Sequence, residues 1–175
     1  MNIIIKKNKQ NSRNSITIKK IEQLMKLNPN KVQNITSFYF ENLIIDGKFL
    51  MLLNKLSLTE LDSFYFIECE FYELNVLSAI TYCKNVGFVK CGLTLDEIKI
   101  MLDWIKDWKI MDTLDLSGNL LGKKPIEFFK YLNWEIWWNI LIKQFNISDN
   151  GFSAEFKVRM QEHNEWFENF LDIVQ

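Results

Sequence analysis

The sequence MDTLDLSGNLL, residues 111–121, decides the interpretation of the whole chain. Its residues follow the order apolar, two variable, apolar, variable, apolar, two variable, Asn, variable, apolar. The alternation of Leu114, Asp115 and Leu116 predicts a short strand with both leucines on one face and the aspartate on the other. Asn119 stands where the chain leaves that strand, and its side chain can hydrogen-bond backbone groups that would otherwise be buried unpaired.

Four further segments follow the same spacing. Three keep the whole pattern with Asn150, Cys91 or Cys69 in the asparagine position, and the fourth has Leu43 there. Equivalent residues lie 26, 22, 28 and 31 positions apart, close to the period of about 20 to 29 residues that marks one class of repeat. The four segments are Ile142, Phe145, Ile147, Asn150, Phe152; Cys83, Val86, Phe88, Cys91, Leu93; Leu61, Phe64, Phe66, Cys69, Phe71; and Ile35, Phe38, Phe40, Leu43, Ile45.

This pattern resembles the signature of the leucine-rich-repeat family, and the helix-like segments between its copies resemble the ribonuclease-inhibitor-like branch of that family. The resemblance covers residues 35–152. It implies an α/β solenoid with a short parallel β-sheet on the concave side and helices on the convex side. We expect one domain over residues 1–175, in which residues 1–34 form an N-terminal cap, residues 35–152 the repeats and residues 153–175 a C-terminal capping helix.

The segments between the repeats carry helical patterns of apolar residues. Ile3–Asn8 holds only part of the repeat pattern, so it is either a capping strand or a chance match. The tryptophans Trp104/Trp108 and Trp134/Trp137/Trp138 form either packed core or a dimer interface. The expected helices are Ile16–Leu27, ended by Asn28-Pro29, then Phe49–Leu56, Leu74–Tyr82, Ile98–Ile105 after a Thr94–Glu97 capping box, and Pro125–Leu132.

Composition narrows the choice of partner. The chain has 175 residues, of which 48% are hydrophobic, so it can bury a core without metals or disulfides. A formal net charge of -1 argues against nucleic acid as a partner. No apolar stretch approaches the roughly 20 residues of a membrane helix, and the charges of Met1–Lys7 follow its apolar run, the reverse of a secretory signal. We therefore expect a cytoplasmic protein that does not enter a membrane.

Residues that could carry catalysis are scarce. The three cysteines, Cys69, Cys83 and Cys91, all occupy positions of the repeat, which explains them without a disulfide framework or a zinc site. His163 is the only histidine, and no nucleophile elbow, phosphate loop or dinucleotide motif is present. We expect no cofactor, no metal and no enzymatic activity. A deep cleft with Glu68 or Asp115 against His163 would reverse that expectation.

The variable strand residues are the candidates for binding, because the repeat fixes the others as core. Tyr39 and Tyr65 fall on adjacent strands, and exposed tyrosines with apolar neighbours are typical of interface hot spots; they could equally cover the sheet edge or meet the N-terminal segment. An acidic run, Asp46, Glu60, Asp62, Glu68, Glu70 and Glu73, would favour a basic partner if it converges, and otherwise forms a solvated rim. The candidate partner-binding residues are Tyr39, Glu41, Tyr65, Ile67, Glu68, Val89 and Asp115.

The leading hypothesis is a non-catalytic module that binds a partner protein across the concave face. The family resemblance further suggests a bacterial inhibitor or immunity protein that masks a toxin. The alternative is a secreted effector or host-directed scaffold built on the same fold, because this family serves many partners.

Overall fold

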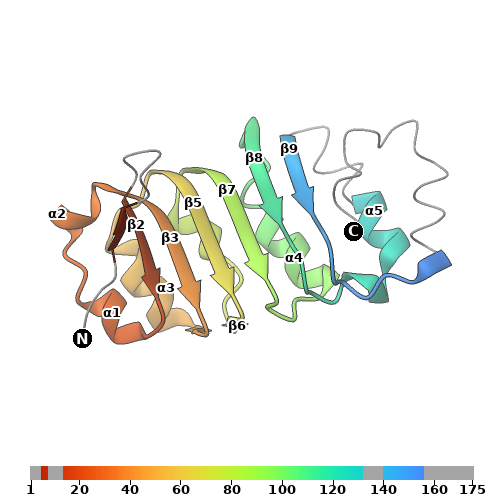
Figure 1. Ribbon diagram of the computed structural model, residues 1–175, viewed down its shortest axis with the longest axis horizontal. Helices are drawn as coiled ribbons and strands as arrows, with labels where there is room; N and C mark the ends of the chain where they lie inside the picture. Colours follow the sequence, from red (N-terminus) through yellow and green to blue (C-terminus); the bar gives the residue numbers. More distant parts are fainter. Residues whose placement is uncertain (1–4, 8–13, 132–139, 156–175) are drawn as a thin grey trace.

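The computed structural model describes residues 5–7, 14–131 and 140–155. Its main sheet has seven strands in the order β1-β2-β3-β5-β7-β8-β9 (Figure 1). The six strands from β2 to β9 pair in parallel and follow the chain order, which confirms an α/β protein with a mostly parallel sheet. The strands are β1 Ile5–Lys7, β2 Asn14–Ile18, β3 Ile35–Glu41, β5 Glu60–Ile67, β7 Tyr82–Val89, β8 Ile110–Asp115 and β9 Leu141–Asn146.

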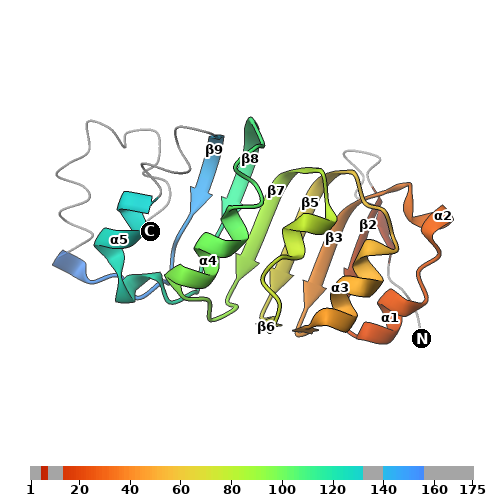
Figure 2. The same cartoon turned by 180° about the vertical axis from the view of Figure 1, so that it is seen from behind.

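The helices α3, α4 and α5 lie on one face of this sheet, as the two opposite views in Figure 1 and Figure 2 show. We call the other side of the sheet the open face. A second, two-stranded sheet pairs β4 with β6 in parallel just beyond the ends of β3 and β5. The remaining elements are α1 Ile21–Met25, α2 Pro29–Val32, β4 Ile44–Ile45, α3 Gly47–Asn54, β6 Glu70–Phe71, the 3₁₀ helix η1 Val76–Ala79, α4 Leu95–Leu102, the 3₁₀ helix η2 Leu121–Lys123 and α5 Pro125–Tyr131.

Aromatic side chains form the centre of the core between the sheet and the helices. Phe40, Phe66 and Phe88 occupy equivalent places on β3, β5 and β7 and are fully buried. The Phe66 ring stacks on Phe40 with 5.0 Å between ring centroids and on Phe88 with 5.5 Å. Phe49 of α3 meets the Phe40 ring edge-on at 5.1 Å, which joins the helix to the row. Packing of this kind adds stability beyond the area it buries.

A second row of contacts joins successive strands through the asparagine position of the repeat. The side-chain amide of Asn119 donates to the carbonyl oxygens of Phe88 at 2.6 Å and Leu116 at 2.8 Å, and its oxygen accepts from the Leu93 N–H at 3.0 Å. Asn150 donates in the same way to Leu116 and Ile147. Each side chain therefore satisfies backbone groups of its own turn and of the preceding strand, as the sequence predicts.

In two turns a cysteine occupies the asparagine position and hydrogen-bonds the preceding strand in its place. Cys69 donates from Sγ to the Phe40 carbonyl at 3.3 Å, and Cys91 to the Phe66 carbonyl at 3.6 Å. All three cysteines are free thiols, so none forms the disulfide that the sequence argued against. Leu43 replaces the polar residue in the remaining turn and is buried there.

The prediction of one helix over Ile16–Leu27 is wrong. Ile16 and Ile18 are buried strand residues of β2, in register with Phe38 and Phe40, and the helix α1 begins only at Ile21. The alternation of buried and half-buried side chains over these residues places their apolar side chains on the same core face, and this tertiary contact overrides the helical spacing. The parallel sheet consequently begins at Asn14.

Other expectations near the chain ends and between strands need smaller corrections. Pro29 starts α2 instead of only ending the preceding helix, with Asn28 as its N-cap. Ile5–Lys7, part of the segment Ile3–Asn8, is a strand, but it pairs antiparallel with β2 and so lies outside the parallel pattern. The helix predicted over Leu74–Tyr82 is only the single 3₁₀ turn η1, because Tyr82 already belongs to β7.

The remaining predicted helices agree with the structure where it describes them. The Thr94–Glu97 capping box is present, and α4 and α5 cover most of the predicted ranges. The two tryptophans after α4 separate: Trp108 is buried against Tyr82, whereas Trp104 is 47% exposed. The second tryptophan group, Trp134/Trp137/Trp138, and most of the predicted capping helix lie outside the described residues.

We expect Asn119→Ala to lower the free energy of unfolding by about 2 to 4 kcal/mol, because it leaves a buried N–H and buried carbonyls unpaired. Asn119→Cys should lower it by roughly half as much, because Cys69 and Cys91 show that a thiol can donate to the equivalent carbonyl of the preceding strand. Urea unfolding followed by circular dichroism measures both. Equal losses in the two variants would show that a thiol at this position does not replace the hydrogen bonds of the amide.

Candidate functional site

The variable strand residues form regular columns on the open face. Tyr39 pairs in register with Tyr65, Tyr65 with Gly87, Gly87 with Asp115 and Asp115 with Asn146, so these residues form one central column, with Tyr39 and Tyr65 on adjacent strands as the sequence predicts. Strand β2 extends this column by Thr17, opposite Tyr39. The columns exist because equivalent apolar residues on the other face are held in one core.

Tyr39 and Tyr65 form the largest feature of the central column. Their rings stack with 5.6 Å between centroids and an angle of 24° between planes. The Tyr65 ring leans over Gly87, where a Cβ atom would lie only 2.2 Å from Tyr65 Cδ1. No other residue leaves room for the ring in this position. Gly87 thus makes room for the Tyr65 ring in this orientation, a role that the sequence alone did not reveal.

Burial raises the pKa of the Tyr65 hydroxyl, and the neighbouring Asp115 carboxylate raises it further. The phenol therefore stays protonated at neutral pH and can donate a hydrogen bond. Since Asp115 lies on the second strand from Tyr65, the ring and the carboxylate approach each other across the gap left by Gly87. The structure brings these two predicted residues together.

Two carboxylates of the candidate set are held by other residues of the chain. Asp115 Oδ1 accepts from the Ser117 backbone N–H at 3.0 Å and from its hydroxyl at 2.7 Å. Glu41 Oε2 lies 2.5 Å from Lys19 Nζ. These contacts orient both carboxylates, and the two hydrogen bonds to Asp115 use only its Oδ1 atom. Lys19 follows β2. Because the sequence predicted a helix over Ile16–Leu27, it did not indicate that Lys19 lies beside Glu41.

A second column of half-buried residues flanks the tyrosines. Glu41 pairs in register with Ile67, and Ile67 with Val89, so the three candidates lie side by side. Glu68 belongs to the turn that follows. It is exposed, adopts a φ of 54°, and donates its backbone N–H to the Val89 carbonyl at 2.9 Å. Glu68 is therefore at the edge of the open face instead of on it.

The turn at Glu68 recurs in every repeat. A residue with positive φ follows each of five strands, and Asn42, Glu68, Lys90 and Gly118 each donate a backbone N–H to a carbonyl at or just after the end of the next strand. Such conformations favour Gly, Asn and Asp. The five residues are Asn42, Glu68, Lys90, Gly118 and Asp149.

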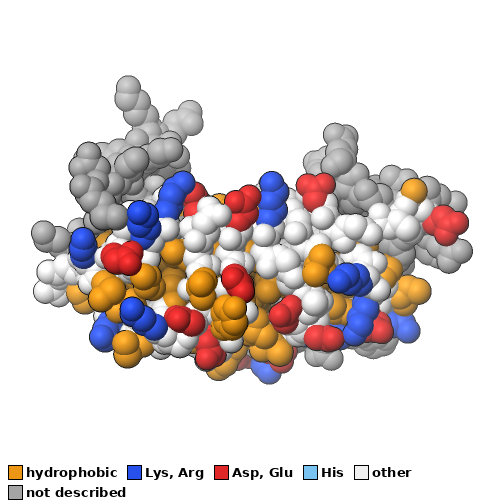
Figure 3. Space-filling view, turned by 90° about the horizontal axis from the view of Figure 1, so that it is seen from below, with side chains coloured by type: hydrophobic (Ala, Val, Ile, Leu, Met, Phe, Trp, Pro, Cys, Tyr) orange, Lys and Arg blue, Asp and Glu red, His pale blue; other side chains and the backbone are white. Residues whose placement is uncertain are grey.

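The acidic run predicted around this half does not converge. Glu60 and Asp62 stand at the start of β5, whereas Glu68, Glu70 and Glu73 follow its end, about 20 Å or more away along an eight-residue strand. Asp62 pairs with Lys84 at 2.9 Å, and Asp46 caps α3 through the Phe49 N–H. Figure 3 views the edge at which the strands end, where acidic side chains alternate with lysines and apolar groups.

Comparison with known proteins identifies no relative: no family model, curated protein or solved structure matches this chain. Within residues 5–7, 14–131 and 140–155, no three His, Cys, Asp or Glu side chains are grouped as a metal site would require. His163 lies outside these ranges. None of the helices in the described ranges has the length and apolar character needed to cross a bilayer.

The thiols are held in their protonated form. Burial raises the pKa of Cys83 and of Cys91 to about 12, and hydrogen bonds from backbone N–H groups to the sulfur lower it only in part. A protonated thiol is a poor nucleophile and a poor metal ligand. Their position in the repeat therefore explains these residues, and we assign them a structural role.

Cys83 and Cys91 should resist alkylation in the folded protein. Raising a thiol pKa from 9.0 to about 12 reduces its thiolate fraction at pH 8 about a thousandfold, so iodoacetamide should react at least that much more slowly than in urea. Mass spectrometry of peptides after timed alkylation measures each site. Rapid modification of either cysteine under native conditions would contradict the structural role.

Proposed function

We propose that this chain is a leucine-rich-repeat solenoid of the ribonuclease-inhibitor-like branch and binds a partner protein through the open face, which is its concave side. Six parallel strands in chain order support this proposal, together with repeat residues that point into one core and side chains that join each turn to the preceding strand. In such an array the outward residues are free of packing duties and available for recognition.

The stacked pair of Tyr39 and Tyr65 is the observation that carries the binding proposal. Two half-buried rings stand in the central column, whose other members, Thr17, Gly87, Asp115 and Asn146, are small or polar. Rigid rings bury much area at little cost in conformational entropy, which is why tyrosine is frequent among hot spots. Gly87 holds Tyr65 in place before any partner arrives, and this preorganisation favours tight binding.

A basic partner suits the charges beside the rings. Asp115 approaches the Tyr65 ring, and Glu41 follows Tyr39 by two residues on β3, so it lies on the same face of the sheet. An arginine laid over the tyrosine faces would gain cation–π attraction and reach the Asp115 carboxylate. Lys19 already contacts Glu41 within the chain, so a basic side chain of the partner can take the same place by exchange.

The proposed biological role is that of a bacterial inhibitor or immunity protein that masks a toxin, a form of binding that needs a wide face and no catalytic group. The first experiment is to purify the chain together with the product of the adjacent gene and to locate their contact by cross-linking. Absence of cross-links to the open face, or failure of the purified chain to inhibit the activity of that gene product, would instead favour an effector or scaffold role.

Tyr65→Ala should weaken binding of the purified partner about 30-fold or more, the loss typical of a hot spot worth about 2 kcal/mol. Gly87→Ala should weaken it to a similar degree, because the added methyl group forces the Tyr65 ring away. Calorimetric titration of the two purified proteins measures both effects.

The matched control is Tyr72→Ala, which removes a tyrosine that is 68% exposed and lies beyond β6, away from the open face. Its affinity should stay within about twofold of wild type, since scattered surface residues contribute little. Urea unfolding checks that all three variants remain folded. Unchanged affinity in both Tyr65→Ala and Gly87→Ala would remove the tyrosine pair as the anchor.

A further inference from the structure

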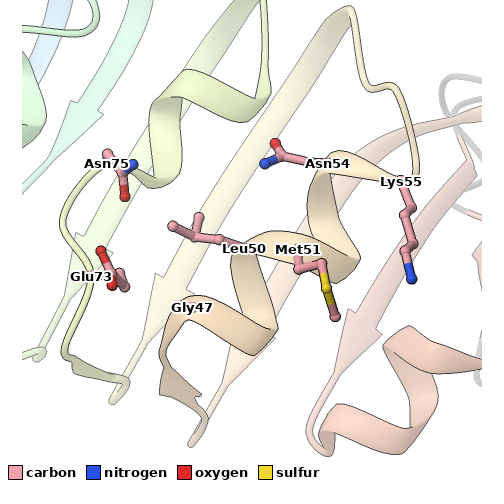
Figure 4. A pocket seen from close by; sticks show the side chains of 7 residues that line it. All are labelled: Gly47, Leu50, Met51, Asn54, Lys55, Glu73 and Asn75. Atoms are coloured by element: carbon pink, nitrogen blue, oxygen red, sulfur yellow. The ribbon is translucent and has the colours of Figure 1, made fainter.

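A separate hollow lies on the side of the molecule that the helices cover, between α3 and the chain that follows β6 (Figure 4). Its volume of about 620 Å³ is within the range of ligand sites, about 300 to 1,000 Å³. Nothing in the proposed use of the open face involves it. The lining residues are Gly47, Leu50, Met51, Asn54, Lys55, Glu73 and Asn75.

One end of the hollow holds two kinds of hydrogen-bond acceptor, an amide oxygen and a carboxylate. Asn75 Oδ1 is buried and has no hydrogen-bond partner within the described part of the chain. The Glu73 carboxylate is at the same end, and in Figure 4 one of its oxygens and the Asn75 amide oxygen point toward one another. An unpaired buried acceptor costs about 1 to 3 kcal/mol, so a donor placed between these groups would be stabilised.

The floor beside this end is apolar. Leu50 and Met51 of α3 line it, and Met51 is 53% exposed. Gly47 adds no side chain to the hollow next to Glu73, and a Cβ there would be in ordinary van der Waals contact with the Glu73 carboxylate oxygen at 3.9 Å. Methylene groups can lie along this floor while a charged head reaches the acceptors, as long basic side chains commonly do.

We propose that this hollow receives an arginine or lysine side chain of a partner protein. The charged head donates to Glu73 and Asn75, and the methylene stem lies on Leu50 and Met51. Lys55 stands at the opposite end in Figure 4 and disfavours a second positive charge there, so the bound segment has one orientation. The hollow exceeds one side chain in volume and has space for the flanking residues.

Other ligand classes fit less well. A single carboxylate gives a divalent cation too few charged oxygen ligands. An anion would meet Glu73 and find only Lys55 in its favour. A neutral apolar group would leave Asn75 Oδ1 unpaired and would place the Glu73 carboxylate against a hydrocarbon.

The probe is N-acetyl-arginine N-methylamide, which presents one arginine as it occurs within a chain, and the matched neutral probe is the citrulline analogue. Each is titrated into the isotopically labelled full chain and followed by NMR. The arginine probe should saturate shifts of the Asn75 side-chain amide and the Leu50 methyls with a millimolar Kd, about 4 kcal/mol of binding. The citrulline probe should bind at least about tenfold more weakly because it lacks the charge.

Glu73→Gln and Asn75→Ala should each weaken the arginine probe about tenfold, since each removes an acceptor for the charged head. Glu60→Gln removes an exposed carboxylate at the start of β5 and should leave the Kd unchanged. Glu73 and Asn75 both lie on the segment between β6 and η1. Dispersed amide signals in the NMR spectra check that each variant is folded. Equal binding of the two probes, or equal losses in Glu73→Gln and Glu60→Gln, would overturn the proposal.

Discussion

The stacking of Phe66 between Phe40 and Phe88 is the contact on which the rest of the structure depends. Because the three rings occupy equivalent places on β3, β5 and β7, they set the register of these strands. A shift of one residue would turn every side chain to the other face of the sheet. The outward columns, and with them the meeting of Tyr39 with Tyr65, follow from that register.

The sequence predicts this part of the molecule well because the information is local and repeated. Each copy of the pattern carries its own alternation of apolar residues and its own turn side chain, so even the copy with Leu43 could be aligned with the others. The positions of the predicted binding residues Tyr39, Tyr65, Ile67, Val89 and Asp115 on the open face follow directly. Glu68 is displaced to the edge because the turn begins there.

Features that arise from contacts outside the repeat could not be predicted in this way. Strand β2 lacks a complete copy of the pattern, and only its packing against β3 distinguishes Ile16 and Ile18 from helical residues. The hollow combines Gly47 and Leu50 with Glu73 and Asn75, which are more than 20 positions apart and belong to segments of variable length. The Tyr65 ring over Gly87 is a three-dimensional fit that no spacing records.

Backbone strain adds an independent reason to associate the edge of the open face with recognition. Asn, Gly and Asp fill three of the five turn positions with positive φ, but the two turns beside Ile67 and Val89 use Glu68 and Lys90. A left-handed conformation costs such residues about 1 kcal/mol or more, which Gly would avoid. Under the proposed function, contact of Glu68 and Lys90 with a partner bound on the adjoining columns would offset this strain.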